Sequence, residues 1–271
     1  MEFEIRPCYA DEIDRFLEIC EASFGKGLPE EDTKRLKHLI EPERTVAAFD
    51  ESDIVATSAA YRFNLTIPGG ELPVAGVSMV GVLPSHRRKG ILTALVREQL
   101  NRMRDWGEPL AVLWASEGAI YQRFGYGMAV PDAGIDLERD LARFIDTSDP
   151  IGRVVLITEE EALKVLPEVY DRVRASVPGM LSRSKSWWEH HRLSDTDAQR
   201  EGGGPMFRAL LEIAGEASGY VLYRINPSWG DDGIHNGTAE VVEAIARGPT
   251  ETRELWRFIL GLDLVARISC S

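Results

Sequence analysis

The sequence of 271 residues contains only three cysteines, Cys8, Cys20 and Cys270, and no CxxC pair. An odd number of widely separated cysteines argues against a disulfide framework and against a zinc knuckle, and it suits a reducing compartment. No stretch approaches the roughly 18 uninterrupted apolar residues of a membrane-spanning helix. The first residues are charged from position 2 onward, unlike the apolar region of a secretory signal. We therefore predict a cytoplasmic protein without a membrane partner.

Positive charge is also scarce, because 31 Lys and Arg against 44 Asp and Glu give a net charge of −13. Nucleic-acid binding requires clustered Lys and Arg, and an anionic chain repels a polyanion. The balance argues against a nucleic-acid partner and favours cationic ones. His190 and His191 are adjacent instead of four residues apart, and the Asp-Asp-Gly at 231–233 lacks the other ligands of a calcium loop, so no metal site is predicted.

Apolar residues make up 44% of the chain, which suffices for a sizeable core, and the length corresponds to one large or two medium domains. The apolar spacing predicts a helix over 11–24, a meander of three strands over 45–82, a helix that begins at 91 and a returning strand over 126–137. The same order of elements recurs from 153 onward. The apolar spacing is weaker in this second half of the chain.

This repetition predicts an α/β (α+β) protein built from two similar folds. The pattern breaks around residue 150, so we place one domain at 1–150 and the other at 151–271. Neighbouring strands joined by short turns predict mixed, mostly antiparallel sheets flanked by helices.

The most informative segment is VAGVSMVGVLPSHRRKGILT at 74–93, in which a predicted strand leads through a basic loop into an amphipathic helix. The amides at a helix start are unpaired donors at the positive end of the helix dipole, and Gly90 allows a ligand to approach them. Arg87, Arg88 and Lys89 add positive charge. The pattern predicts a pyrophosphate site, and the alternative is a solvated basic turn.

This segment resembles the acetyl-CoA signature of the GNAT superfamily of N-acetyltransferases, an Arg or Gln, two residues, Gly, one residue, then Gly or Ala. Here it reads Arg87-Arg88-Lys89-Gly90-Ile91-Leu92, and Leu92 departs from the usual small residue. The segment IYQRFGY at 120–126 resembles the superfamily's tyrosine-containing turn. The runs SMVGVLPSHRRKGIL, ASEGAIYQRFGYG, GYVLYRI and LWRFILGLDLVARI together resemble the Eis (enhanced intracellular survival) branch over nearly the whole chain.

The resemblance implies two tandem GNAT folds, a hexameric assembly, and the acetylation of amines on aminoglycosides and lysines with acetyl-CoA as donor. It also implies a third, sterol-carrier-like domain, which these 271 residues do not include. Carried onto this sequence, together with the charge of the basic loop, it predicts a cofactor site formed by Val80, Gly81, Val82, Arg87, Arg88, Lys89, Gly90, Ile91, Leu92, Thr93, Ser116 and Glu117.

By the same resemblance Tyr121 is the general acid that protonates the departing thiolate of CoA. A thiol has a pKa near ~8.5 and a tyrosine near ~10, so full transfer is uphill by about 2 kcal/mol unless the phenol is perturbed. We expect a helix start just before Tyr121 to favour the phenolate and reduce this gap. The alternative is a structural tyrosine in a packed turn, which is the role that we predict for Tyr126.

The second half has no equivalent loop, because Pro249 removes an amide donor and the basic run is missing. We predict that it binds no acetyl-CoA and walls the acceptor cleft instead. Trp187, Trp188 and Asp32 are candidates for contact with a cationic amine, a polyamine, an aminoglycoside or a lysine. For the two tryptophans, burial in a core or between domains is the alternative.

The predicted reaction is direct attack of an amine on the thioester, without an acyl-enzyme. In Eis-type proteins the far C-terminal carboxylate is proposed as the base. Here a water passed through Glu117, or another acidic residue, is the candidate, or else the chain is a truncated or naturally short member with low activity. A non-catalytic acyl-CoA sensor or assembly module is the rival from another class. An aminoacyl transferase of paired folds is the rival among enzymes, which the anionic charge disfavours.

Overall fold

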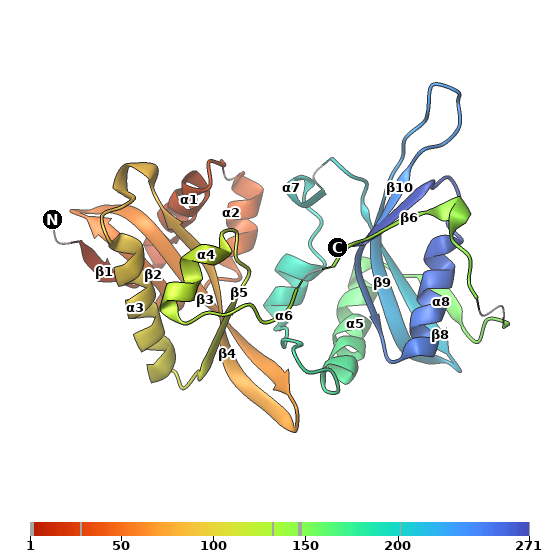
Figure 1. Ribbon diagram of the computed structural model, residues 1–271, viewed down its shortest axis with the longest axis horizontal. Helices are drawn as coiled ribbons and strands as arrows, with labels where there is room; N and C mark the ends of the chain where they lie inside the picture. Colours follow the sequence, from red (N-terminus) through yellow and green to blue (C-terminus); the bar gives the residue numbers. More distant parts are fainter. Residues whose placement is uncertain (1–2, 28, 132, 146–147, 201, 271) are drawn as a thin grey trace. The chain divides into compact units, whose positions relative to one another are not determined.

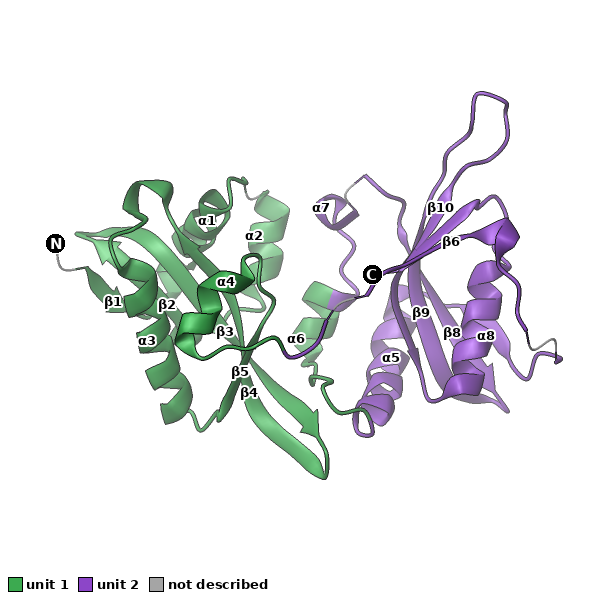
Figure 2. Cartoon of the chain, in the orientation of Figure 1, with its two compact units in different colours: residues 1–128, 177–191 green, residues 129–176, 192–271 purple. Residues whose placement is uncertain are grey.

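Alternating apolar strands and amphipathic helices form two separate sheets, one in each of two compact units. The computed structural model describes residues 3–27, 29–131, 133–145, 148–200 and 202–270. One unit contains residues 1–128 and 177–191, and the other contains 129–176 and 192–271 (Figure 2). Each unit is therefore assembled from two stretches of the chain.

The first unit has a five-stranded sheet of order β1-β2-β3-β4-β5, in which only β4 and β5 are parallel (Figure 1). Its strands are β1 (Glu4–Arg6), β2 (Thr45–Asp50), β3 (Asp53–Ile67), β4 (Gly70–Val82) and β5 (Leu110–Leu113). Its helices are α1 (Ile13–Ser23), α2 (Glu30–Lys37), α3 (Ile91–Asp105), α4 (Gly118–Tyr121) and α6 (Lys185–Trp187). Short 3-10 turns occupy Ala10–Glu12, Pro42–Arg44, Pro84–His86 and Gln122–Phe124.

Both faces of this sheet are covered, because successive residues of a strand point to opposite sides. Ala47 and Phe49 of β2 pack in a core with α1, whereas Val46 and Ala48 pack in a core with the start of α3. A strand buried on both faces reads as a continuous apolar run. The run from Thr45 to Phe49 is therefore fully buried.

The second unit has a six-stranded sheet of order β6-β11-β10-β9-β8-β7, in which only β10 and β11 are parallel. The strands are β6 (Ile135–Glu138), β7 (Arg153–Leu156), β8 (Met206–Ile213), β9 (Glu216–Asn226), β10 (Thr238–Ala246) and β11 (Arg267–Cys270). Its helices are α5 (Glu159–Arg174), α7 (Asp197–Arg200) and α8 (Pro249–Leu260), with a 3-10 turn at Arg139–Leu141. A π-helical turn at Trp188–Arg192 belongs to the first unit except for its last residue. The twofold repetition of mixed, mostly antiparallel sheets confirms the predicted fold class.

The predicted returning strand over 126–137 is confirmed only at its end. Gly125 adopts φ +93°, which turns the chain, and among the described residues of this stretch only those from Ile135 to Glu138 are extended in a sheet. That strand pairs antiparallel with β11, from Ile135 opposite Cys270 to Glu138 opposite Arg267. The division between compact units consequently falls at 128/129, whereas the sequence pattern breaks near 150.

Residues 177–191 return to the first unit, and 179–182 pair with the part of β3 that lies past the start of β2. The amide of Thr66 donates to the carbonyl of Met180 at 2.9 Å, and the amide of Gly179 donates to the carbonyl of Thr66 at 2.8 Å. Trp187 then packs edge-on against Tyr61 and Phe63 of β3, with ring centroids 5.1 and 5.0 Å apart. In the described part of the chain, no helix combines the length and apolarity that crossing a membrane requires.

Candidate active site

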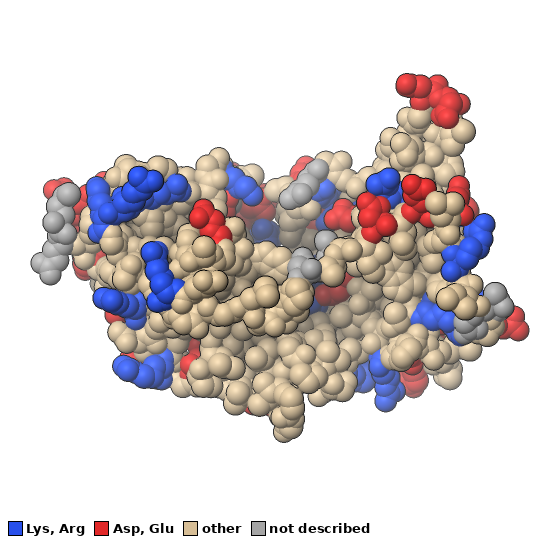
Figure 3. All heavy atoms as spheres, in the orientation of Figure 1, with Lys and Arg blue, Asp and Glu red and all other residues tan. Residues whose placement is uncertain are grey.

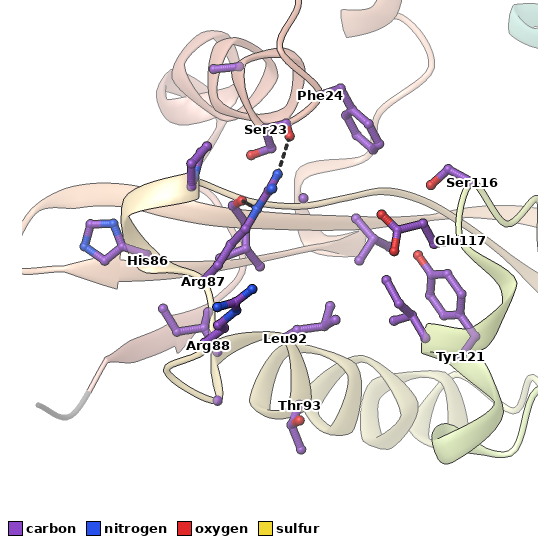
Figure 4. A pocket seen from close by; sticks show the side chains of 18 of the residues that line it. Ser23, Phe24, His86, Arg87, Arg88, Leu92, Thr93, Ser116, Glu117 and Tyr121 are labelled. Carbon is purple, nitrogen blue, oxygen red and sulfur yellow. Dashed lines mark hydrogen bonds between the residues drawn. The ribbon is translucent and has the colours of Figure 1, made fainter.

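A cavity of about 920 Å³ lies in the first unit, between the end of α1, the end of β4, the start of α3 and the segment around α4 (Figure 4). We call it the first cavity. Most of the predicted cofactor residues line it, namely Val80, Gly81, Val82, Arg87, Arg88, Gly90, Ile91, Leu92, Thr93, Ser116 and Glu117, together with Tyr121. Lys89 is exposed and is not among the lining residues.

The first cavity opens where β4 separates from β5. Their parallel pairing ends at Val77 opposite Leu113, whereas β4 continues to Val82. Along this described stretch, residues 78–82 adjoin β3 on one side and are not paired with β5 on the other. Met79 has φ +55°, and the register against β3 shifts beside it, so β4 bends here. The backbone of Val80 to Val82 is thereby available to a ligand with amide groups.

Gly81 allows the end of α1 to approach β4 closely. A Cβ at this position would lie 2.7 Å from the Cβ of Ser23, which is too short for two carbon atoms. Ser23 is buried, and its hydroxyl donates to the carbonyl of Ile19 at 2.8 Å. Residues 22–25 at this helix end also line the first cavity. They carry no signal in the local sequence pattern, because the contact joins segments about 60 residues apart.

The loop before α3 presents backbone amides to the first cavity. Gly90 is the N-cap of α3 with φ +84°, a left-handed conformation that favours glycine. The first intrahelical hydrogen bond runs from the amide of Ala94 to the carbonyl of Gly90. The amides of Ile91, Leu92 and Thr93 therefore precede it, at the positive end of a 15-residue helix. This is the arrangement that binds phosphate groups.

Arg87 and Arg88 have different environments. The guanidinium of Arg87 donates to the carbonyl of Ser23 at 2.9 Å and to the carbonyl of Val82 at 3.2 Å. It thus fastens the end of α1 to the end of β4, and Figure 4 shows it directed at Ser23. Arg88, at φ +62°, lies beside Leu92 at the rim of the first cavity. On the face drawn in Figure 3, Lys and Arg gather at the loop before α3, while Asp and Glu gather over the second unit.

Tyr121 projects into the first cavity with its hydroxyl toward Glu117 (Figure 4). Burial raises the pKa of the phenol above its usual value, and the Glu117 carboxylate raises this pKa further. The expectation of a phenolate-favouring helix start is therefore wrong, because Tyr121 is the last residue of the four-residue α4. Tyr126 is half-buried and packs edge-on against Tyr121, with centroids 5.8 Å apart, so it supports the ring without belonging to a core.

A second cavity of about 480 Å³ adjoins the first within the same unit. Phe24, Val80, Ser116 and Tyr121 line both cavities. Trp187, one of the three predicted acceptor residues, lines the second cavity. The two cavities thus meet beside the phenol of Tyr121.

Asp32 and Trp188, the other two predicted acceptor residues, do not line the second cavity. Asp32 is 4% exposed and pairs with Arg35, whose Nε lies 3.1 Å from its carboxylate. Arg35 lines the second cavity and also donates to the carbonyl of His190 at 2.8 Å, so Asp32 lies behind it. Trp188 is 2% exposed and stacks under the guanidinium of Arg183. Burial is therefore the role of Trp188.

The equivalent turn of the second unit lacks these features. Its helix α8 begins at Pro249, which has no amide hydrogen, and Gly248 before it is extended instead of left-handed. The acidic side chain of Glu251 lies in the first turn. This end of the second sheet is therefore poorly suited to a phosphate.

A strand that separates from its parallel neighbour, a glycine-led helix start and a tyrosine beside them define the class of acyl-CoA-dependent acetyltransferases. Residues 4–129 match the family described as Acetyltransferase (GNAT) domain, and residues 179–271 match a second family with the same description. The chain belongs to the GNAT superfamily of acetyltransferases, in its Eis-like branch.

The relatives include an uncharacterised N-acetyltransferase of Streptomyces avermitilis, 34% identical over 276 residues, which cover 99% of this chain and 66% of that protein. The N-acetyltransferase Eis of Mycobacterium tuberculosis is 35% identical over 257 residues, 92% of this chain and 61% of Eis. The crystal structure of Eis1 from Mycobacterium abscessus matches with a TM-score of 0.80 and 32% identity, covering 99% of this chain and 65% of Eis1. The chain therefore spans about two thirds of the length of the relatives it matches.

Proposed function

We propose that this chain catalyses transfer of the acetyl group of acetyl-CoA to the nitrogen of an amine by direct attack. The observation that carries the proposal is the first cavity, where the unpaired edge of β4, the start of α3 and Tyr121 come together. Acetyl-CoA supplies the thioester and leaves as a thiol once the C–N bond has formed and the C–S bond has broken. The acceptor is an amine that reaches the thioester from the second cavity.

The residues of the first cavity fit each part of the donor. The backbone of Val80 to Val82 suits the amides of pantetheine, which pair with a strand edge as an added strand does. The amides of Ile91 to Thr93 suit the pyrophosphate, and Arg88 adds a positive charge next to it. Arg87, which the sequence also places among the ligands, lines the same cavity, and its hydrogen bond to the carbonyl of Ser23 fastens the cavity wall.

Tyr121 then acts on the leaving sulfur. Because its pKa is raised, its phenol stays protonated at neutral pH and donates a hydrogen bond to the developing thiolate. The amine must lose a proton before or during attack, since an alkylammonium with a pKa near ~10.4 has no lone pair. Glu117, directly or through a water, is the acceptor for that proton. Cytoplasmic location and hexameric assembly stay predictions from the sequence and its resemblance.

The proposal is tested by measuring thiol release from acetyl-CoA with a panel of amines, alongside the Kd for acetyl-CoA from calorimetry. We expect Tyr121→Phe to lower kcat by about 100-fold or more while the Kd stays unchanged. Tyr9→Phe is the matched control, because Tyr9 is 66% exposed and lies outside the cavity lining. Binding of acetyl-CoA with no turnover of any amine would favour the acyl-CoA sensor and overturn the proposal.

A further inference from the structure

Six aromatic side chains contribute to the walls of the second cavity, alongside aliphatic ones. Tyr61 of β3, Phe24 after α1, Trp114 after β5, Tyr121, Trp187 and His191 all line it. These residues come from five separate segments, so no sequence motif and no periodic helical pattern predicts that they lie together. An aromatic box of this kind binds a flat ring by stacking or edge contact, and it binds a single ammonium group over a ring face.

On one side the aromatic wall is packed against further rings of β3. Trp187 meets Tyr61 and Phe63 at interplanar angles of 77° and 84°, the edge-to-face arrangement that aromatic pairs prefer. His191 packs on Trp187 with centroids 4.3 Å apart. On another side, Trp114 is 84% exposed. An aromatic ligand ring in the cavity can therefore pack against Trp187 on one side and bury the exposed indole of Trp114 on the other.

The charges of the second cavity do not suit a polycation. Among the described residues that line it, Glu21 is the only carboxylate and Arg35 the only cationic side chain of Lys or Arg type. Arg35 is itself balanced by the buried Asp32 behind it. An acceptor with several ammonium groups needs several carboxylates to replace the water it loses, whereas one ammonium group needs one.

From these observations, and resting on the proposed acetyl transfer, we infer that the acceptor is a monoamine that carries an aromatic ring, an arylalkylamine. Its ring lies against Trp187 and Tyr61, and its nitrogen points toward Tyr121, where the two cavities meet. Glu21 pairs with the ammonium before it loses its proton. The products are the N-acetyl arylalkylamine, CoA thiol and one proton, so the reaction needs no further reactant.

The inference is tested by comparing kcat/KM for phenethylamine and tryptamine with the values for butylamine, spermidine and kanamycin. We expect the two aromatic amines to exceed butylamine by about tenfold or more, because a ring in an aromatic box gains burial and edge contacts. Spermidine and kanamycin should be poorer acceptors than either aromatic amine. Equal values for butylamine and phenethylamine, or a preference for spermidine or kanamycin, would overturn the inference while leaving the acetyl transfer intact.

Two variants locate the ring. Trp187→Leu and Trp114→Ala should each lower the ratio of kcat/KM for phenethylamine to kcat/KM for butylamine by about fivefold. The Trp114 indole is 84% exposed, so Trp114→Ala should leave the fold intact and can be measured even if Trp187→Leu disturbs folding. Trp229→Ala is the matched control, because Trp229 is 63% exposed and lies in the second unit. An equal effect of a variant on both amines contradicts the inference. If the unmodified protein turns over no amine at all, the proposed function is overturned as well.

Discussion

At the scale of single residues, two neighbouring arginines in one short loop have separate tasks. The guanidinium of Arg87 is engaged by two backbone carbonyls, and that of Arg88 lies at the rim of the first cavity. Both arginines were predicted as donor ligands from their charge and position in the loop. The hydrogen-bond partners that distinguish Arg87 lie at the ends of α1 and β4, which the loop sequence does not reveal.

This difference predicts opposite phenotypes for the same substitution. Arg88→Gln should weaken binding of acetyl-CoA by about tenfold, the value of a lost hydrogen bond to a charged group, with the Tm unchanged. Arg87→Gln should lower stability by about 1 kcal/mol and the Tm by roughly 2–4 °C. Calorimetry and thermal denaturation on both variants check this. The same loss of affinity with no loss of Tm in Arg87→Gln would contradict it.

The raised pKa of Tyr121 predicts the pH dependence of the reaction. A phenol with a pKa above 10.0 keeps its proton throughout the neutral and mildly alkaline range, so its hydrogen bond to sulfur is present there and lost only at higher pH. The amine gains reactive neutral form as pH rises toward its own pKa of ~10.4. We therefore expect kcat/KM to rise steadily between about pH 7 and 9. A fall within that range would contradict the assignment of Tyr121.

Replacing Glu117 separates the two influences on this phenol. Burial is the larger cause of the raised pKa and the Glu117 carboxylate the smaller, so Glu117→Gln should lower the pKa without restoring its ordinary value. Carbon NMR of labelled tyrosine measures it. The same variant should also slow turnover if Glu117 accepts the proton of the amine.

At the scale of elements, a buried ion pair fixes the chain just before β5, the strand that pairs with β4. The carboxylate of Glu108, just before β5, receives two hydrogen bonds from Arg44 at 2.7 and 2.9 Å. Both side chains are 3% exposed. Arg44 also donates to the carbonyl of Ala60 and lies over the ring of Trp106. This buried pair joins the start of β2 to the end of α3 and to β5.

Breaking the pair should therefore unfold the first unit more readily. Glu108→Ala leaves the guanidinium of Arg44 buried without its carboxylate, which typically costs about 3–5 kcal/mol. Denaturant unfolding of the variant measures this. Glu18→Ala is the matched control, because the pair of Glu18 with Arg15 is solvent-exposed and contributes about 1 kcal/mol or less.

The elements themselves were largely predictable, and their pairing was not. The helices at 13–23 and 91–105 and the meander over 45–82 follow from local periodicity, which the sequence displays directly. The strand expected over 126–137 forms only from Ile135 onward, because Gly125 turns the chain and the pairing partner, β11, lies about 130 residues away. The motif of the first cavity is contiguous and was found, whereas the aromatic wall of the second cavity is assembled from distant segments.

At the scale of the whole molecule, the two units share an architecture but differ at the turn that precedes the last helix. The first unit has a left-handed Gly90 and free helix-start amides, and the second has Pro249. We therefore expect one acetyl-CoA to bind per chain, which calorimetric titration measures as the stoichiometry. Pro249→Ala should leave that number at one, since it restores an amide without supplying a basic loop. A stoichiometry of two would contradict the assignment.

The chain passes between the units three times, at 128/129, at 176/177 and at 191/192. No single cut of the chain therefore yields two intact halves. A fragment that ends at 128 lacks Trp187, and a fragment that starts at 129 contains Trp187 without the β3 residues on which it packs. Separately produced halves should regain full activity only when they are mixed. The Trp187 side of the second cavity and the β4 edge of the first cavity therefore cannot be produced as two independent fragments, although both lie in one compact unit.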